Sequence, residues 1–91
     1  MKYFKKNVIE KLGGEYIRVL EEVLKIRESR RSIWKDSFLN ENEKDLLVLI
    51  EGKIKRFKNT NNIIYKIDSL RDAINYIIFL LCVINKNNKK L

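Results

Sequence analysis

The sequence predicts an all-α protein, a small bundle of three to four helices that forms a single domain over residues 1–91. The chain has no proline and only three glycines, so it lacks most of the residues that tight turns require. Its composition, 45% hydrophobic and 35% charged, is that of a folded globular protein. Its apolar residues recur at spacings of three and four along extended segments, which indicates amphipathic helices.

Two helices are predicted in the first third of the chain. A short leading helix covers residues 3–12, and the pair Gly13-Gly14 ends it, because glycine breaks helices and favours turns. A longer helix then runs from Glu15 to about Arg30, with acids early and arginines late, as the helix dipole favours. The apolar positions of this second helix are Tyr16, Ile17, Leu20, Val23, Leu24 and Ile26.

A connection or irregular turn of helix, "RRSIWKDSFLNEN", leads to the next long helix, which is predicted over residues 43–58. Asn40 followed by Glu43 has the spacing of a capping box, and Asn42 is the alternative cap. Four polar residues, "NTNN", end the helix. The inward stripe of this helix is expected to consist of Leu46, Leu47, Ile50, Ile54 and Phe57.

The last helix is expected to start between Asn62 and Ser69 and to end near Asn85. It is apolar on most sides, and such a helix is buried on most sides. Because so short a chain has a modest core of its own, we expect one side of this helix to meet a second copy, in a homodimer. One face consists of Ile67, Leu70, Ile74, Ile77, Ile78 and Leu81, and Tyr76, Phe79, Leu80 and Val83 cover much of the rest.

The net charge of +8 favours anionic partners such as nucleic acid, nucleotides or a membrane surface. Part of this charge lies in two basic ends, residues 1–12 and 86–91. Lys, Asn and Ile are all abundant, as they are in proteins from AT-rich genomes, so codon bias is the alternative origin of the charge.

The single cysteine, Cys82, cannot form an internal disulfide, which favours a reduced, intracellular and cytoplasmic setting. Cys82 is expected to be a small core residue. The start of the chain lacks an apolar core segment, so we expect no signal peptide. The longest apolar run, residues 73–84, is shorter than the about 20 residues that a membrane-spanning helix needs, so no membrane is expected.

A polar strip runs along the last helix. Asp68, Asp72 and Asn75 are spaced by four and three, so they share one side of the helix. Two carboxylates one turn apart can reach one hard divalent cation, and Glu51, at the edge of the preceding helix, can join them. The strip therefore predicts a magnesium site at Asp72, Asp68 and Glu51. The alternative is that the acids cap the helix and pair with Arg71 and Lys66.

Cationic and aromatic residues suggest a ligand beside that site. Lys53 and Arg56 are three apart on one edge of their helix, where both can hold phosphate oxygens. Trp34, the only tryptophan, can stack on a base or anchor a loop. Gly52, in the middle of the same helix, suggests a close helix approach. The chain has no histidine and no glycine-rich phosphate loop, which excludes histidine triads, zinc fingers and P-loops.

The segments "RRSIWKDSF", "DLLVLIEGKIKRFKN" and "IDSLRDAINYIIFLL" occur in an order that resembles the nucleotide-modification-associated domains of phages and bacteria. More loosely, the chain is similar to the all-helical MazG-like nucleoside triphosphate pyrophosphatases. The resemblance covers residues 27–84 and implies a helical fold, a nucleotide or phosphate ligand, and magnesium held by acids. The Glu-x-x-Glu and Glu-x-x-Asp pairs of the pyrophosphatases are missing here. The matched positions are Trp34, Lys53, Arg56, Asp72, Asn75 and Tyr76.

Three functions are compatible with the sequence. The first is binding or processing of a nucleotide, as a magnesium-dependent phosphohydrolase-like protein of phage nucleotide metabolism. Its ligand residues are Lys53, Arg56, Trp34, Asn75 and Tyr76, and no catalytic residue is assigned. The second is a basic helical binding protein for nucleic acid or a protein partner, without catalysis. The third is a structural or regulatory dimer. In the basic binding protein, the positive charge that attracts the partner would come from Arg27, Arg30, Arg31, Lys35, Lys53 and Lys55.

Overall fold

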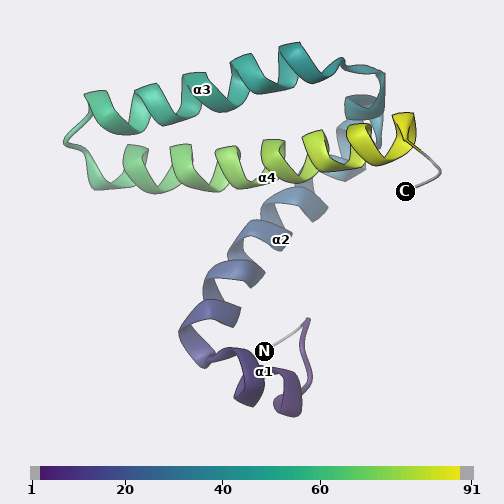
Figure 1. Ribbon diagram of the computed structural model, residues 1–91. Helices are drawn as coiled ribbons and strands as arrows, with labels where there is room; N and C mark the ends of the chain where they lie inside the picture. Colours follow the sequence, from purple (N-terminus) through teal and green to yellow (C-terminus); the bar gives the residue numbers. More distant parts are fainter. Residues whose placement is uncertain (1–2, 89–91) are drawn as a thin grey trace. The chain divides into compact units, whose positions relative to one another are not determined.

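The computed structural model describes residues 3–88, and these residues form four α-helices, one 3-10 turn and no strand (Figure 1). The predicted all-α class is therefore confirmed. The helices fall into two compact units, the first within residues 1–35 and the second within residues 36–91.

In the first unit, the short helix α1 (Lys6–Leu12) leads directly into the long helix α2 (Gly14–Trp34). Gly13 makes the turn with a φ of 94°, which residues with a Cβ rarely adopt. The predicted glycine break is thus confirmed. Helix α2 is longer than predicted, because helical hydrogen bonding continues through the expected connection until the N–H of Lys35 donates to the carbonyl of Arg31.

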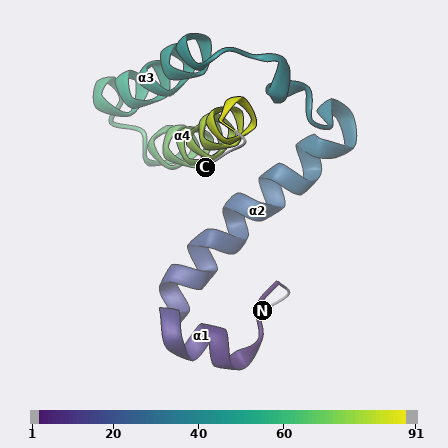
Figure 2. The same ribbon diagram turned by 45° about the vertical axis from the view of Figure 1, so that its right-hand side comes forward.

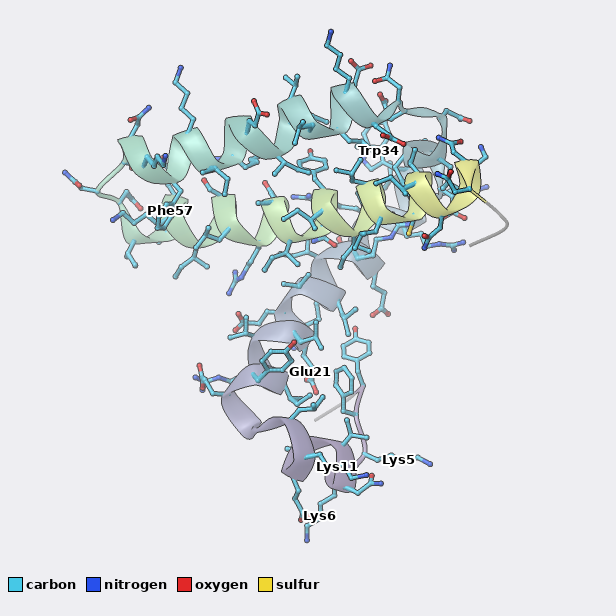
Figure 3. All side chains as sticks on the ribbon, in the orientation of Figure 1. Lys5, Lys6, Lys11, Glu21, Trp34 and Phe57 are labelled. Atoms are coloured by element: carbon cyan, nitrogen blue, oxygen red, sulfur yellow. The ribbon has the colours of Figure 1, made fainter. Side chains whose placement is uncertain are left out.

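The first unit buries few apolar side chains. Ile17 and Val23 of α2 are buried, and so is Glu21 (Figure 3). Among residues 3–88, the Oε1 of Glu21 has no hydrogen-bond partner. A buried carboxylate oxygen without a partner opposes folding, because it has lost its water. The hydroxyl of Tyr3 donates a hydrogen bond to Glu28 and so ties the start of the chain to α2.

The second unit contains the 3-10 turn η1 (Ser37–Asn40) and two long helices, α3 (Glu43–Asn59) and α4 (Ile63–Asn87). Helices α3 and α4 run antiparallel as a hairpin, side by side in both views (Figures 1 and 2). Phe57 lies near the loop that joins them (Figure 3). The turn η1 packs on α4, where the ring of Phe38 stacks on that of Phe79 with centroids 4.2 Å apart.

Both long helices of the second unit begin at an asparagine cap. The Asn42 side chain accepts a hydrogen bond from the N–H of Asp45 at 2.8 Å, so the alternative cap, not Asn40, is the one used. The Asn62 side chain accepts from the N–H groups of Ile64 and Tyr65, which sets the earlier of the two predicted starts for α4.

The buried contact between α3 and α4 uses a narrow set of side chains. Leu46 and Ile50 of α3 are buried, and so are Ala73 and Val83 of α4. Ser69, the alternative start of α4, lies inside the helix, where its hydroxyl donates to the carbonyl of Tyr65 at 2.7 Å.

The prediction of the inward stripe of α3 is confirmed for Leu46 and Ile50 but is wrong for Leu47 and Ile54. These two are 47% and 36% exposed, because only one face of α3 meets α4. A Cβ added at Gly52 would meet nothing within 4 Å, so the expected close approach at this glycine is also wrong.

The predicted apolar face of α4 is largely outside the hairpin core. Its exposed fractions range from 37% at Ile74 to 56% at Leu81. The single cysteine, Cys82, is free and half-buried. Across residues 3–88, no helix is both long enough and apolar enough to cross a membrane.

Candidate ligand site on the α3–α4 hairpin

An ion pair joins the two helices of the hairpin at the centre of the predicted site. The Nζ of Lys53, from α3, lies 3.0 Å from a carboxylate oxygen of Asp72, from α4, and their side chains are 25% and 13% exposed. The two residues were assigned to a phosphate and to a metal, respectively, and the structure brings them together. The ammonium supplies the positive charge that a cation would otherwise bring to Asp72, so a metal must compete with Lys53 for this carboxylate.

The other two predicted metal ligands are exposed. Asp68 lies one turn before Asp72 on α4, and Glu51 lies on α3. Glu51 and Lys53 are two residues apart, which places them about 200° apart around the helix, so Glu51 points away from the ion pair. Within residues 3–88, no group of three or more His, Cys, Asp or Glu side chains is placed to hold a metal ion. The magnesium site at Asp72, Asp68 and Glu51 stays a prediction.

The amide of Asn75 is used inside its own helix. Asn75 is only 4% exposed, and its Nδ2 donates to the carbonyl of Arg71 one turn earlier at 3.3 Å. A buried amide in a mostly apolar helix is tolerated when the backbone provides a partner of this kind. Tyr76, the other matched ring, is half-buried and meets the ring of Phe79 edge-on, with centroids 6.1 Å apart.

Exposed cationic and aromatic side chains meet at the hairpin tip, defined as residues 52–67, which includes the predicted ligand residues Lys53 and Arg56. The guanidinium of Arg56 lies over the ring of Tyr65, 5.0 Å from its centroid, and Tyr65 is 50% exposed. A second such contact places the ammonium of Lys66 5.4 Å from the ring centroid of Phe57. Both contacts hold a cation near the end of α3 or the start of α4 by its attraction to an aromatic face.

The charge of the hairpin tip is of one sign. No acidic residue lies between Glu51 and Asp68 in the sequence. Lys55, Arg56 and Lys58 are exposed, whereas the ammonium of Lys53 is engaged by Asp72. Apart from Lys53, whose charge Asp72 offsets, this exposed cluster attracts anions because residues 52–67 themselves contain no carboxylate. The five cations of the tip are Lys53, Lys55, Arg56, Lys58 and Lys66.

Tyr65 was missed at the sequence level. It lies before the polar strip of α4 and nine residues after Arg56, so no helical spacing relates the two. Only the antiparallel pairing of α3 with α4 brings the guanidinium over the ring. A signal was present, because the turn "NTNN" between two amphipathic segments predicts that residues equally far from it on either side are neighbours.

Trp34 and the arginines near it belong to the first unit. Trp34 ends α2 and is 65% exposed (Figure 3). Arg30, Arg31 and Lys35 are exposed, and Arg27 is half-buried. The basic end of α2 belongs to the first unit and the hairpin tip to the second, and the assignment of Trp34 to the same ligand as Arg56 stays a prediction.

Comparison with known proteins returns no relative. No family model matches the chain, and no curated protein and no solved structure shows a significant match to it. The resemblance to nucleotide-modification-associated domains and to MazG-like pyrophosphatases therefore stays a prediction from the quoted segments.

Proposed function

We propose that the protein is a basic helical binding protein and that its hairpin tip binds the phosphate backbone of nucleic acid. The observation that supports this proposal is the Arg56 guanidinium held 5.0 Å from the centroid of the half-exposed Tyr65 ring, among cations with no acid between residues 52 and 67. Backbone phosphates are bound by Lys and Arg, and bases stack on exposed aromatic rings.

The chemistry of the tip suits a single-stranded ligand. One face of the Tyr65 ring is covered by Arg56, and Tyr65 is 50% exposed, so we expect a base to stack on the other face of the ring. Lys55 and Lys58 flank Arg56 on α3 and are exposed, so they can neutralise neighbouring phosphates. Three phosphate contacts of this kind would give a slope of about −2 for log binding constant against log salt concentration on a single strand.

A second candidate function is binding or processing of a free nucleotide with magnesium. The Arg56–Tyr65 pair also favours this candidate, because a planar guanidinium and a ring can hold one phosphate and one base. Asp72 and Asp68 would supply the magnesium ligands. In this candidate the metal displaces the ammonium of Lys53 from Asp72, and Lys53 then becomes available to a phosphate.

One binding experiment separates the two candidates. Fluorescence anisotropy of a labelled single-stranded oligonucleotide is measured from low to high salt, and thermal shifts are measured with nucleoside triphosphates with and without magnesium. We expect oligonucleotide binding that weakens with salt, and we expect Arg56→Ala and Tyr65→Ala each to weaken it about tenfold, since stacking is worth about 1–3 kcal/mol per base.

The matched control is Lys44→Ala, which removes an exposed cation at the opposite end of α3. It should weaken oligonucleotide binding less than Arg56→Ala. A thermal shift that needs both triphosphate and magnesium and is lost in Asp72→Asn would support the nucleotide candidate instead. Oligonucleotide binding that is independent of salt, or equal loss in Lys44→Ala and Arg56→Ala, would reject the hairpin tip as the binding surface.

A further inference from the structure

The outer side of α4 carries an unbroken heptad pattern. Its apolar residues alternate between spacings of four and three over three complete heptads, which is the a and d pattern of coiled coils. All of these positions are isoleucine or leucine, with no polar interruption. We name this set the α4 seam, and it consists of Ile63, Ile67, Leu70, Ile74, Ile77, Leu81 and Ile84.

The α4 seam is not the face that α4 uses inside the hairpin. The buried residues of α4 are Ser69, Ala73, Asn75 and Val83, and all four lie at other heptad positions than the α4 seam. Six of the seven seam residues are 37% to 65% exposed, and only Ile84 is half-buried. The helix therefore buries Ser69 and Ala73 and leaves most of its large aliphatic residues exposed. This distribution is the reverse of what a helix that packs only within its own chain requires.

We propose that the α4 seam docks against the α4 seam of a second copy of this chain. A repeat of 3.5 residues selects a helix as partner, because knobs from one helix enter holes of another only when both keep the same repeat. A second copy offers such a helix by construction, with the same phase and the same uniformly aliphatic positions. Two α3–α4 hairpins joined in this way form a four-helix bundle.

Helix α3 extends the same surface. The Lys53–Asp72 and Arg56–Tyr65 contacts lie on one flank of the hairpin. On a helical wheel, Leu47 and Ile54 of α3 lie on the opposite flank, which is also the side of the α4 seam. Both residues are exposed. The apolar flank is roughly 30 Å long and two helices, or roughly 20 Å, wide, hence about 600 Å² in projection. Stable interfaces bury about 800 Å² of surface on each partner, and the area of the apolar flank approaches this value.

The test is the mass of the full chain in solution, measured by sedimentation equilibrium over a wide concentration range. We expect twice the 10.9 kDa chain mass for the unmodified protein. Ile74→Glu places a charge at the middle of the α4 seam and should weaken the dimer at least tenfold, while circular dichroism at high dilution stays unchanged because Ile74 is exposed in the single chain.

Val48→Glu is the matched control. Val48 is 60% exposed on α3 and points away from α4 on the helical wheel, so the same charge change there should leave the dimer mass unchanged. The proposal would be overturned if the unmodified protein is a monomer. This holds whether the α4 seam of that monomer faces water or is covered by another part of the same chain. So would a dimer that Ile74→Glu leaves intact.

A second measurement covers the case in which Ile74→Glu does not fold. If the α4 seam holds a dimer, the melting temperature of the unmodified protein rises with its concentration, because dissociation accompanies unfolding. A melting temperature that does not change with concentration would also count against the proposal.

Discussion

The two units of this protein are stabilised in different ways. The second unit pairs two long antiparallel helices along a buried strip, and an asparagine side chain caps the start of each helix. In the described part of the first unit, neither helix has a side-chain cap, and the turn between them depends on a glycine with a φ of 94°. The difference shows that the hairpin is held by side-chain packing, whereas the first unit depends more on backbone conformation.

The largest expected effect is in the core of the hairpin. Leu46 is 1% exposed on α3, so Leu46→Ala removes methyl groups from a packed site and leaves a cavity. It should lower the free energy of unfolding by about 2–4 kcal/mol. Urea denaturation at one fixed protein concentration measures this change. Ile33→Ala, at a 73% exposed site of the first unit, is the comparison and should change the stability by less than about 0.5 kcal/mol.

The next effects come from two glycines, and they have opposite signs. Gly13→Ala should destabilise the first unit by about 1–2 kcal/mol, because a Cβ is strained at the φ of 94°. Gly52→Ala should stabilise α3 by about 0.5–1 kcal/mol, because Gly52 is inside a helix and its Cβ position is open. Urea denaturation of both variants measures this. If both substitutions changed the free energy of unfolding in the same direction, the first unit would not depend on backbone conformation more than the second unit does.

The smallest effect is a titration at the start of the first unit. The hydrogen bond from the Tyr3 hydroxyl to Glu28 raises the pKa of Tyr3 above its ordinary value of 10.0. The contact is therefore present below pH 10 and is lost as the pH rises through the raised pKa, because the phenolate cannot donate. The ionisation of tyrosine is followed by ultraviolet absorbance during a pH titration. The difference between the titration curves of the unmodified protein and of Tyr3→Phe should show that Tyr3 ionises above pH 10.

Glu28→Gln is the control for that titration. It keeps the shape of the side chain but removes its negative charge, so the pKa of Tyr3 should fall back toward 10.0. A Tyr3 that ionises at or below pH 10 in the unmodified protein would show that the first unit is not tied together at this contact.

The sequence predicted which types of residue form the candidate site, but not which side chains of α3 contact which side chains of α4. Helical spacing correctly placed Asp68, Asp72 and Asn75 along one side of α4. It could not show that Lys53 would pair with Asp72, because partners on different helices are set by the register of the hairpin. For the same reason, Tyr65 was absent from the predicted ligand residues.

The sequence by itself determined the helices, because the glycine break at Gly13, the caps at Asn42 and Asn62 and the apolar periodicity act over a few residues. Only the tertiary structure decided which face of each helix is covered. Helix α4 is apolar on several sides, so its periodicity alone allows more than one inward face. Packing in the hairpin buried the face with Ser69 and Ala73, and it left most of the aliphatic α4 seam exposed. The register of α3 against α4, which no local pattern encodes, made this choice.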